Sequence, residues 1–214
     1  MSLDTIYALS SGRGRAGVAV IRLSGPQAWP VAKAMTGTPP VNRRAVRRCL
    51  KDPATQETLD SCLCLGFLGP ASFTGEDVVE FHIHGGLAVV AGVLEALEAQ
   101  PGLRLSDPGE FTRRAFENER IDLTEAESIG DLIDAETSAQ RRQALRQGGG
   151  LLARQCESWR KDLVSALAYW EAAIDFSDEE LPVELESKTK HKISTLLGQI
   201  LEKLDDGGAG ERLR

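Results

Sequence analysis

The pattern of apolar residues changes at about residue 120, and this change limits the folds open to the chain. Before it, β-rich runs such as TIYAL and VAVIRL alternate with glycine-rich turns and short helical segments. After it, apolar residues recur at spacings of three and four over several turns, which is typical of long amphipathic helices. We therefore expect an α+β domain over residues 1–118, followed by long antiparallel helices over residues 119–214.

Several helix boundaries can be predicted from local signals. The stretch GLAVVAGVLEALEAQ has helical periodicity and precedes a Pro-Gly pair, and a short helix is expected after Asp107-Pro108-Gly109. Thr124 and Glu127 have the spacing of a capping box, which predicts a helix from there through Glu136 and beyond.

Composition narrows the classes of protein to consider. No apolar run approaches 18 residues, which indicates no membrane span, and the first residues lack the features of a secretory signal. The four cysteines include no Cys-x-x-Cys pair, so we expect reduced, mostly buried thiols, no structural zinc and a cytoplasmic protein.

The net charge of −7 lies wholly in the second half, since residues 1–118 carry 12 cations and 12 anions. A broad nucleic-acid groove on the second half is therefore disfavoured. One basic cluster stands out in the first half. Its members are Arg43, Arg44, Arg47, Arg48 and Lys51. We interpret the cluster as a solvated loop and strand edge, and the alternative is a contact with phosphate.

The stretch FTGEDVVEFHIHGG predicts a strand with chemically distinct faces. Its odd positions from 79 to 83 are apolar, whereas Glu80, His82 and His84 share the other face. A carboxylate and two imidazoles resemble a metal site, but alternate residues lie about 6.6 Å apart, so three rarely converge without a bulge. The alternative is a polar sheet face that lines a cleft or packs under a helix, and no metal is expected.

Arg22 lies inside the apolar strand VAVIRL, where a lone arginine is normally paired or bound. With Glu80 it can form a structural ion pair or two halves of a polar binding site, and the residues leave both open. The preceding GRGRAG turn lacks the phosphate-loop pattern and precedes a strand, so nucleotide binding there is disfavoured.

Several motifs in consistent order resemble one family. They are DTIYALSSGRGRAGVAVIRLSGP, SFTGEDVVEFHIHGG, DPGEFTRRAFENERIDLTEAESIGDLIDAET and WRKDLVSALAYWEAAIDF. Together they are similar to the tRNA-modification GTPases called MnmE or TrmE. The resemblance implies a mixed-sheet N-terminal domain like the folate-binding module of glycine-cleavage T-protein, which binds a tetrahydrofolate derivative and makes a homodimer. An α-helical bundle segment would follow, into which the family inserts a G domain.

The sequence departs from that family pattern in one large way. It contains no phosphate loop, no Asn-Lys-x-Asp and no Cys-x-Gly-Lys ending. The resemblance therefore implies a chain that stops before the G domain, and no catalytic residue is expected within it.

The family's folate contacts, carried over by position, fall on Arg22, Glu80 and Arg120, the last often Lys in the family. One carboxylate can accept from two adjacent pterin donors, which suits Glu80, while either arginine can hold the anionic tail or a ring carbonyl.

The resemblance also implies a role for the whole enzyme. With the flavoprotein MnmG (GidA), it would modify carbon-5 of the wobble uridine of certain tRNAs. The one-carbon donor would be 5-formyl- or methylene-tetrahydrofolate, and GTP, potassium and magnesium would serve the G domain. Two alternatives are a dimerisation scaffold without ligand and a metal-dependent hydrolase centred on Glu80, His82 and His84.

Overall fold

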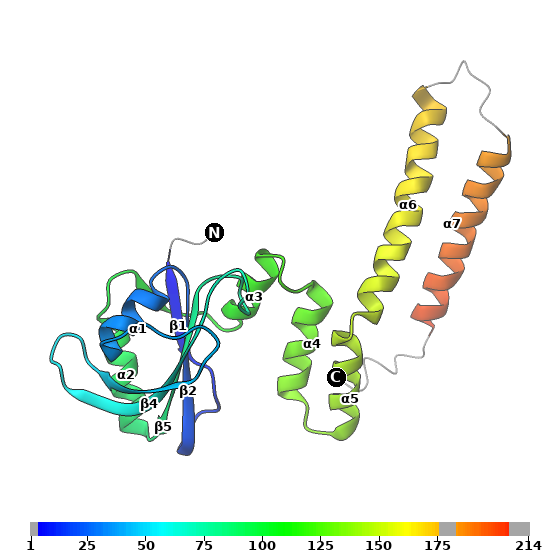
Figure 1. Cartoon of the computed structure of the whole chain (residues 1–214). Helices are drawn as coiled ribbons and strands as arrows, with labels where there is room; N and C mark the ends of the chain where they lie inside the picture. Colours follow the sequence, from blue (N-terminus) through cyan, green and yellow to red (C-terminus); the bar gives the residue numbers. More distant parts are fainter. Residues whose placement is uncertain (1–3, 176–182, 206–214) are drawn as a thin grey trace. The chain divides into compact units, whose positions relative to one another are not determined.

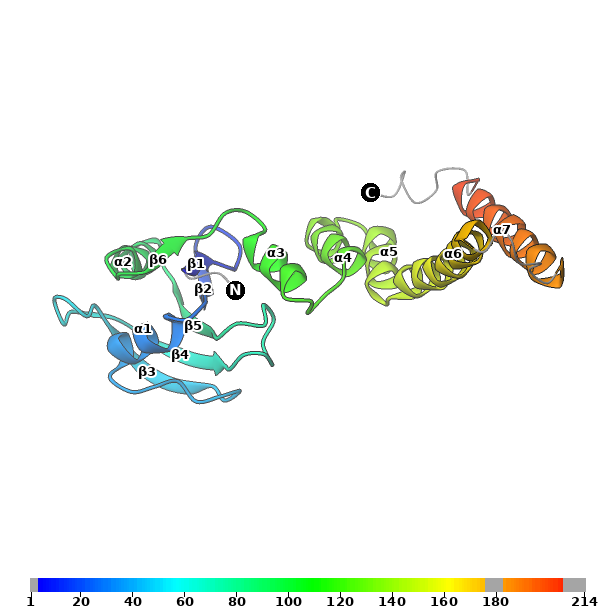
Figure 2. The ribbon, with the colours of Figure 1, turned by 90° about the horizontal axis from the view of Figure 1, so that it is seen from above.

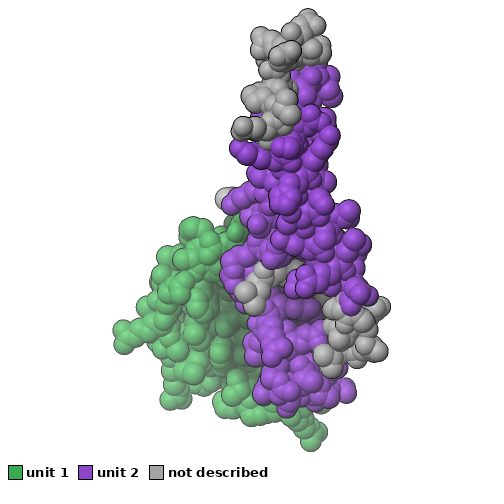
Figure 3. Space-filling view, turned by 90° about the vertical axis from the view of Figure 1, so that its right-hand side faces the viewer, with its two compact units in different colours: residues 1–121 green, residues 122–214 purple. Residues whose placement is uncertain are grey.

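The chain forms two compact units that meet at residues 121 and 122 (Figure 3). The computed structural model describes residues 4–175 and 183–205. The first unit contains a sheet with helices, and the described residues of the second unit form helices without strands, so the predicted α+β class is confirmed.

The sheet of the first unit has six strands in the order β3-β4-β5-β2-β1-β6 (Figures 1 and 2). Only the pairing of β1 with β6 is parallel, so the sheet is mixed, as expected. The strands are β1 Thr5–Leu9, β2 Ala16–Ser24, β3 Val46–Lys51, β4 Thr58–Phe67, β5 Val78–Gly85 and β6 Leu103–Leu105.

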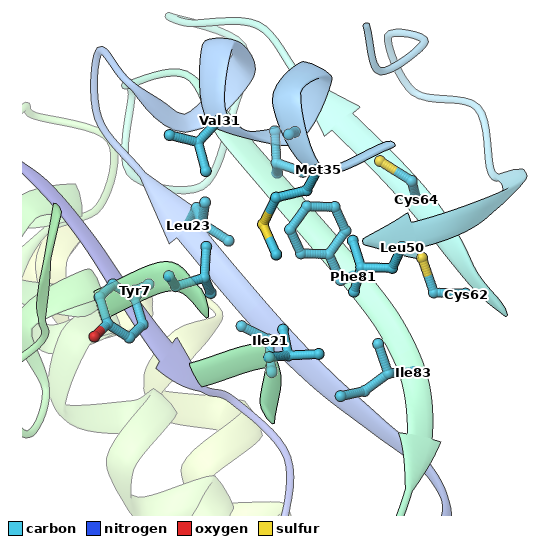
Figure 4. Packing of buried hydrophobic residues seen from close by; sticks show 14 of the residues in the cluster. Tyr7, Ile21, Leu23, Val31, Met35, Leu50, Cys62, Cys64, Phe81 and Ile83 are labelled. Carbon is cyan, nitrogen blue, oxygen red and sulfur yellow. The ribbon is translucent and has the colours of Figure 1, made fainter. Parts of the chain in front are cut away.

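One face of this sheet is covered by the helices α1 (Ala28–Thr36) and α2 (Leu87–Glu98). Alternate residues of β2 and β5 point to this face, and Ile21 and Phe81 are completely buried there. Figure 4 shows Met35 of α1 above Phe81 within this core. The predicted alternation in β5 is confirmed, because Val79, Phe81 and Ile83 are buried and Glu80, His82 and His84 are not.

The opposite face of the sheet is more open. Arg22 and Glu80 lie on it directly opposite each other across the β2–β5 pair. The short helix α3 (Glu110–Glu117) approaches this face, since the ring of Phe111 lies 5.6 Å from the Arg22 guanidinium carbon. Leu63, which is paired with His82 on the same face, stays 46% exposed, so this part of the face is open to solvent.

The second unit contains α4 (Leu123–Asp134), α5 (Ser138–Gly148), α6 (Leu151–Asp175) and α7 (Val183–Leu204). Helices α6 and α7 run antiparallel, as expected. Trp159 donates to Gln199 at 2.8 Å, and Lys192 lies 4.0 Å from Asp162. No helix within the described residues is long and apolar enough to cross a membrane.

The capping box predicted at Thr124 and Glu127 is wrong. Asp122 is the N-cap, and its carboxylate accepts from the Glu125 backbone while Glu125 accepts from the Asp122 backbone. Thr124 instead donates its hydroxyl to Asp122. The helix also ends at Asp134, because a second capping box, Thr137 with Gln140, starts a separate helix. An aspartate two positions earlier therefore outcompetes the threonine as the cap.

Candidate functional site

An arginine–carboxylate pair forms the centre of the candidate site. The Nε and Nη2 atoms of Arg22 both lie 2.8 Å from Oε1 of Glu80. The Arg22 side chain is 28% exposed and that of Glu80 is 15% exposed, so the pair is shielded but within reach of solvent. The predicted ion pair of Arg22 with Glu80 is confirmed, and the pair keeps a side that solvent can reach.

The two histidines of β5 have different partners. Nε2 of His82 lies 3.2 Å from Oε2 of Glu80, whereas Nδ1 of His84 lies 2.7 Å from Oδ1 of Asp60. Asp60 also accepts the His84 backbone N–H. Burial raises the pKa of Asp60, but these hydrogen bonds outweigh it and hold the pKa below its ordinary value.

This separation does not favour the metal-site alternative. His84 turns towards Asp60 while His82 turns towards Glu80, so the three predicted ligands do not converge. In the described part of the chain, no group of three or more His, Cys, Asp or Glu side chains is arranged to hold a metal ion.

Two aromatic rings flank the arginine of this pair. The guanidinium carbon of Arg22 lies 5.8 Å from the ring centre of Phe73 and 5.6 Å from that of Phe111. Phe73 precedes β5 and is 37% exposed, while Phe111 belongs to α3. Neither ring was predicted from the sequence as part of the site, although both lie in the motifs SFTGED and PGEF that carried the family resemblance. Such contacts hold a cation in place and present flat apolar surface to a ligand.

Arg120, the third predicted site residue, lies in the turn after α3. Its backbone N–H donates to Ala115 at 2.8 Å, and its side chain is exposed. A Cβ added at Gly75 would lie 3.1 Å from Arg120 Cγ and 3.2 Å from Asn118 Cβ. The loop that carries Phe73 therefore also packs against Arg120. Within the described residues the Arg120 guanidinium has no ion-pair partner.

A buried ionic cluster fixes the two elements that carry these rings. Arg114 of α3 is 3% exposed, lies 3.2 Å from both carboxylate oxygens of Glu76 and contacts Asp4 at 2.8 Å. Glu76 also accepts from the hydroxyl of Ser24, two residues beyond Arg22 on β2, at 2.6 Å. This cluster was not predicted from the sequence, because it joins side chains up to 110 positions apart.

Glu110 is the most buried carboxylate of this cluster, with 1% of its side chain exposed. Its oxygens accept from Arg104, from Arg114 and from the Asp107 backbone. The hydrogen bonds from Arg104 are the main reason that the pKa of Glu110 falls to about 2. Burial opposes the charge of Arg114, but Glu76 and its other carboxylate partners still raise the pKa of that guanidinium. Glu110 and Arg114 are therefore charged at neutral pH, and the cluster holds α3 against the loop before β5.

Comparisons with known proteins cover both units. The family described as GTP-binding protein TrmE N-terminus matches residues 5–120, and the MnmE helical domain matches residues 123–214. The tRNA modification GTPase MnmE of Parvibaculum lavamentivorans is 56% identical over 213 residues, covering 99% of this chain and 49% of that protein. The MnmE of Rhodospirillum rubrum is 51% identical, covering 100% of this chain and 50% of that protein.

A mitochondrial relative from the mouse is also similar. It is a subunit of 5-taurinomethyluridine-[tRNA] synthase, GTPB3, and is 51% identical over 98% of this chain and 43% of its own length. The chain thus spans about half the length of the curated relatives it matches.

Proposed function

Because the chain belongs to the MnmE family of tRNA modification GTPases, we propose that its first unit holds a tetrahydrofolate one-carbon donor for such an enzyme. One observation carries this proposal. Glu80 presents a partly open carboxylate on a sheet face, beside a guanidinium that lies between two aromatic rings. A folate has the matching chemistry, with a flat ring bearing adjacent N–H donors and an anionic tail.

Glu80 is proposed to accept hydrogen bonds from the pterin edge. A carboxylate has about four lone-pair sites, and Arg22 and His82 occupy three of those on Glu80. One lone-pair site of Glu80 is therefore free, whereas the two adjacent N–H donors of a pterin need two. The contact with His82 is the longest of the three, at 3.2 Å. We expect His82 to give way, while the two contacts from Arg22 keep the carboxylate oriented.

The contacts of the two arginines support different roles for them in this proposal. Arg22 is committed to Glu80 and to its two aromatic neighbours. Arg120 is exposed and, among the described residues, unpaired, so it is the better candidate for the anionic tail. Both rings and Arg120 belong to the same unit as Glu80.

The rest of the proposal concerns the whole enzyme. With a flavoprotein partner (MnmG) it would modify carbon-5 of the wobble uridine of certain tRNAs in the cytoplasm, and GTP, potassium and magnesium would act in a G domain outside these residues. Homodimer formation through the first unit is supported by exposed apolar residues of its sheet, among them Val18 and Leu63. The folate can be 5-formyl- or methylene-tetrahydrofolate.

Calorimetric titration with 5-formyltetrahydrofolate tests the folate proposal. We expect saturable binding by the wild type, loss of at least about tenfold in affinity for Glu80→Gln, and equal or tighter binding for His82→Ala. Asp60→Asn is the matched control, because it alters a carboxylate of the same sheet that forms an ion pair with His84 rather than with Arg22.

Other outcomes separate the alternatives. A folded, dimeric wild type that ignores folate would favour the scaffold. Stoichiometric zinc or iron that is lost in His84→Ala would favour the hydrolase instead.

A further inference from the structure

Strand β3 and the loop before it carry an unusual concentration of positive charge. Five cations lie within the stretch from residue 43 to residue 51, and no acidic residue interrupts them. We call this set the basic edge; it consists of Arg43, Arg44, Arg47, Arg48 and Lys51. The whole chain has a net charge of −7, so the basic edge is a local exception to an acidic molecule.

The cations of the basic edge are not neutralised by the fold. In the first unit, the arginines that form ion pairs among the described residues are Arg22, Arg104, Arg113 and Arg114, none of which belongs to this set. The nearest acid in sequence, Asp52, accepts from the Ala54 backbone and the Thr55 hydroxyl within its own turn. Arg43 donates to the Ala71 carbonyl and Arg47 to the Ser61 hydroxyl, but these acceptors are uncharged, so the basic edge has no counter-ion among the described residues.

The position of β3 makes these charges accessible. It is an outer strand of the sheet, paired only with β4, so its other side presents backbone N–H groups with no strand beside them (Figure 2). The arginines at 43, 44 and 47 and the lysine at 51 are exposed, and Arg48 is half-buried. Exposed guanidinium groups and free backbone N–H groups are the donors that contact nucleic-acid phosphates.

Protection of the sheet edge against aggregation explains only part of this pattern. Charged residues on an outer strand do prevent edge-to-edge pairing. Arg43 and Arg44, however, precede the strand, and four of the five cations are arginines, which suit bidentate phosphate contacts.

The cations also fit an extended anion better than a small one. Arg47 and Arg48 point to opposite faces of β3, so they cannot close on one small ligand. From residue 46 to residue 51 the strand extends roughly 17 Å, which suits a chain of phosphates.

We propose that the basic edge binds the phosphate backbone of RNA, and that this RNA is the tRNA substrate. The inference rests on the proposed function for the identity of the RNA, whereas the charge pattern itself does not depend on it. Arg47 is paired across the sheet with Leu63, which is paired with His82. The backbones of β3 and β5 are therefore about 10 Å apart, and an RNA held at this edge lies beside the face that carries Glu80.

Fluorescence anisotropy with a labelled, unmodified tRNA transcript tests the proposal. The affinity of the 214-residue chain would be measured at several salt concentrations and compared with Arg44→Glu/Arg47→Glu. Loss of two phosphate contacts should reduce the magnitude of the slope of log affinity against log salt by about 1.4 to 1.8. Near 0.1 M salt it should also weaken binding at least about tenfold. Both side chains are exposed, and Arg47 makes one hydrogen bond, to Ser61, so folding should be unchanged by circular dichroism.

A matched control separates local contact from general attraction. Arg13→Glu/Arg15→Glu makes the same change in net charge on the exposed turn between β1 and β2, and it should retain the wild-type salt dependence. Equal weakening in both double variants would overturn the proposal, as would a wild type without saturable, salt-dependent binding. A basic-edge variant that aggregates but binds tRNA normally would also overturn it, in favour of edge protection.

The folate titration keeps the two proposals apart. Chains that bind tRNA through the basic edge but ignore 5-formyltetrahydrofolate would refute the folate site and support the basic edge. Chains that bind folate but not tRNA would refute the basic edge alone.

Discussion

Replacement of Glu110 by glutamine should strongly destabilise the first unit at neutral pH. In the wild type the two carboxylate oxygens accept from Arg104, Arg114 and the Asp107 backbone. The amide of Glu110→Gln removes the negative charge and places an N–H2 group among these donors. Removal of one partner from a buried charge cluster leaves the remaining charges poorly compensated.

The size of the effect follows from the pKa of Glu110, which Arg104 lowers from 4.5 to about 2. That difference corresponds to about 3 kcal/mol of folding free energy at neutral pH. Arg104 is 42% exposed, so solvent screening reduces the expectation to about 2 kcal/mol. Because the folded-state pKa is lowered, the stabilisation is complete above about pH 4.5 and is lost as the pH falls towards 2.

Urea unfolding followed by the fluorescence of Trp29 measures this effect. Trp29 packs against the core of the first unit, and replacement of Trp159 and Trp170 by phenylalanine removes the signals of the second unit. Glu117→Gln is the control; that side chain is 61% exposed and should change stability by less than about 0.5 kcal/mol. A Glu110→Gln effect below about 0.5 kcal/mol at pH 7, or one that does not shrink between pH 5 and pH 3, would refute the reasoning.

Two further predictions concern the same unit. Burial raises the pKa of Cys62 to about 12 and that of Cys64 to about 11. Iodoacetamide at pH 8 should therefore label the exposed Cys49 far faster than either buried thiol, as measured by mass spectrometry of the peptides. Similar labelling rates for the three cysteines would contradict the packing. Gly75→Ala should lower the free energy of unfolding, measured in urea, by about 1–2 kcal/mol, because Gly75 has φ of +79° and the new Cβ would crowd Arg120. Unchanged stability together with unchanged folate affinity would count against that packing.

Prediction from sequence succeeds where a property depends on neighbours along the chain. Alternation in FTGEDVVEFHIHGG is enough to separate the buried face of β5 from the face that carries Glu80. The strand VAVIRL likewise places Arg22 on the face opposite the core residue Ile21. The helical spacing after residue 120 is also a local pattern, so the change from sheet to helices can be predicted from the sequence alone.

Other features depend on which distant segments meet, and the chain does not encode these in any local pattern. His84 shares a face with Glu80 by periodicity, yet it pairs with Asp60 because β4 brings that carboxylate to the end of β5. Phe111 reaches Arg22 only because α3 returns to the sheet after nearly ninety residues.

The sequence by itself therefore determined the strand faces, the helical second half and the residue types of the candidate site. Only the tertiary structure decided that Arg22 is bound to Glu80 while Arg120 is exposed. It alone revealed the buried cluster around Arg114, which joins residues up to 110 positions apart. The physical reason is that periodicity fixes the direction of each side chain along one element, whereas the partner it meets is selected when separate elements pack and buried charges must find one another.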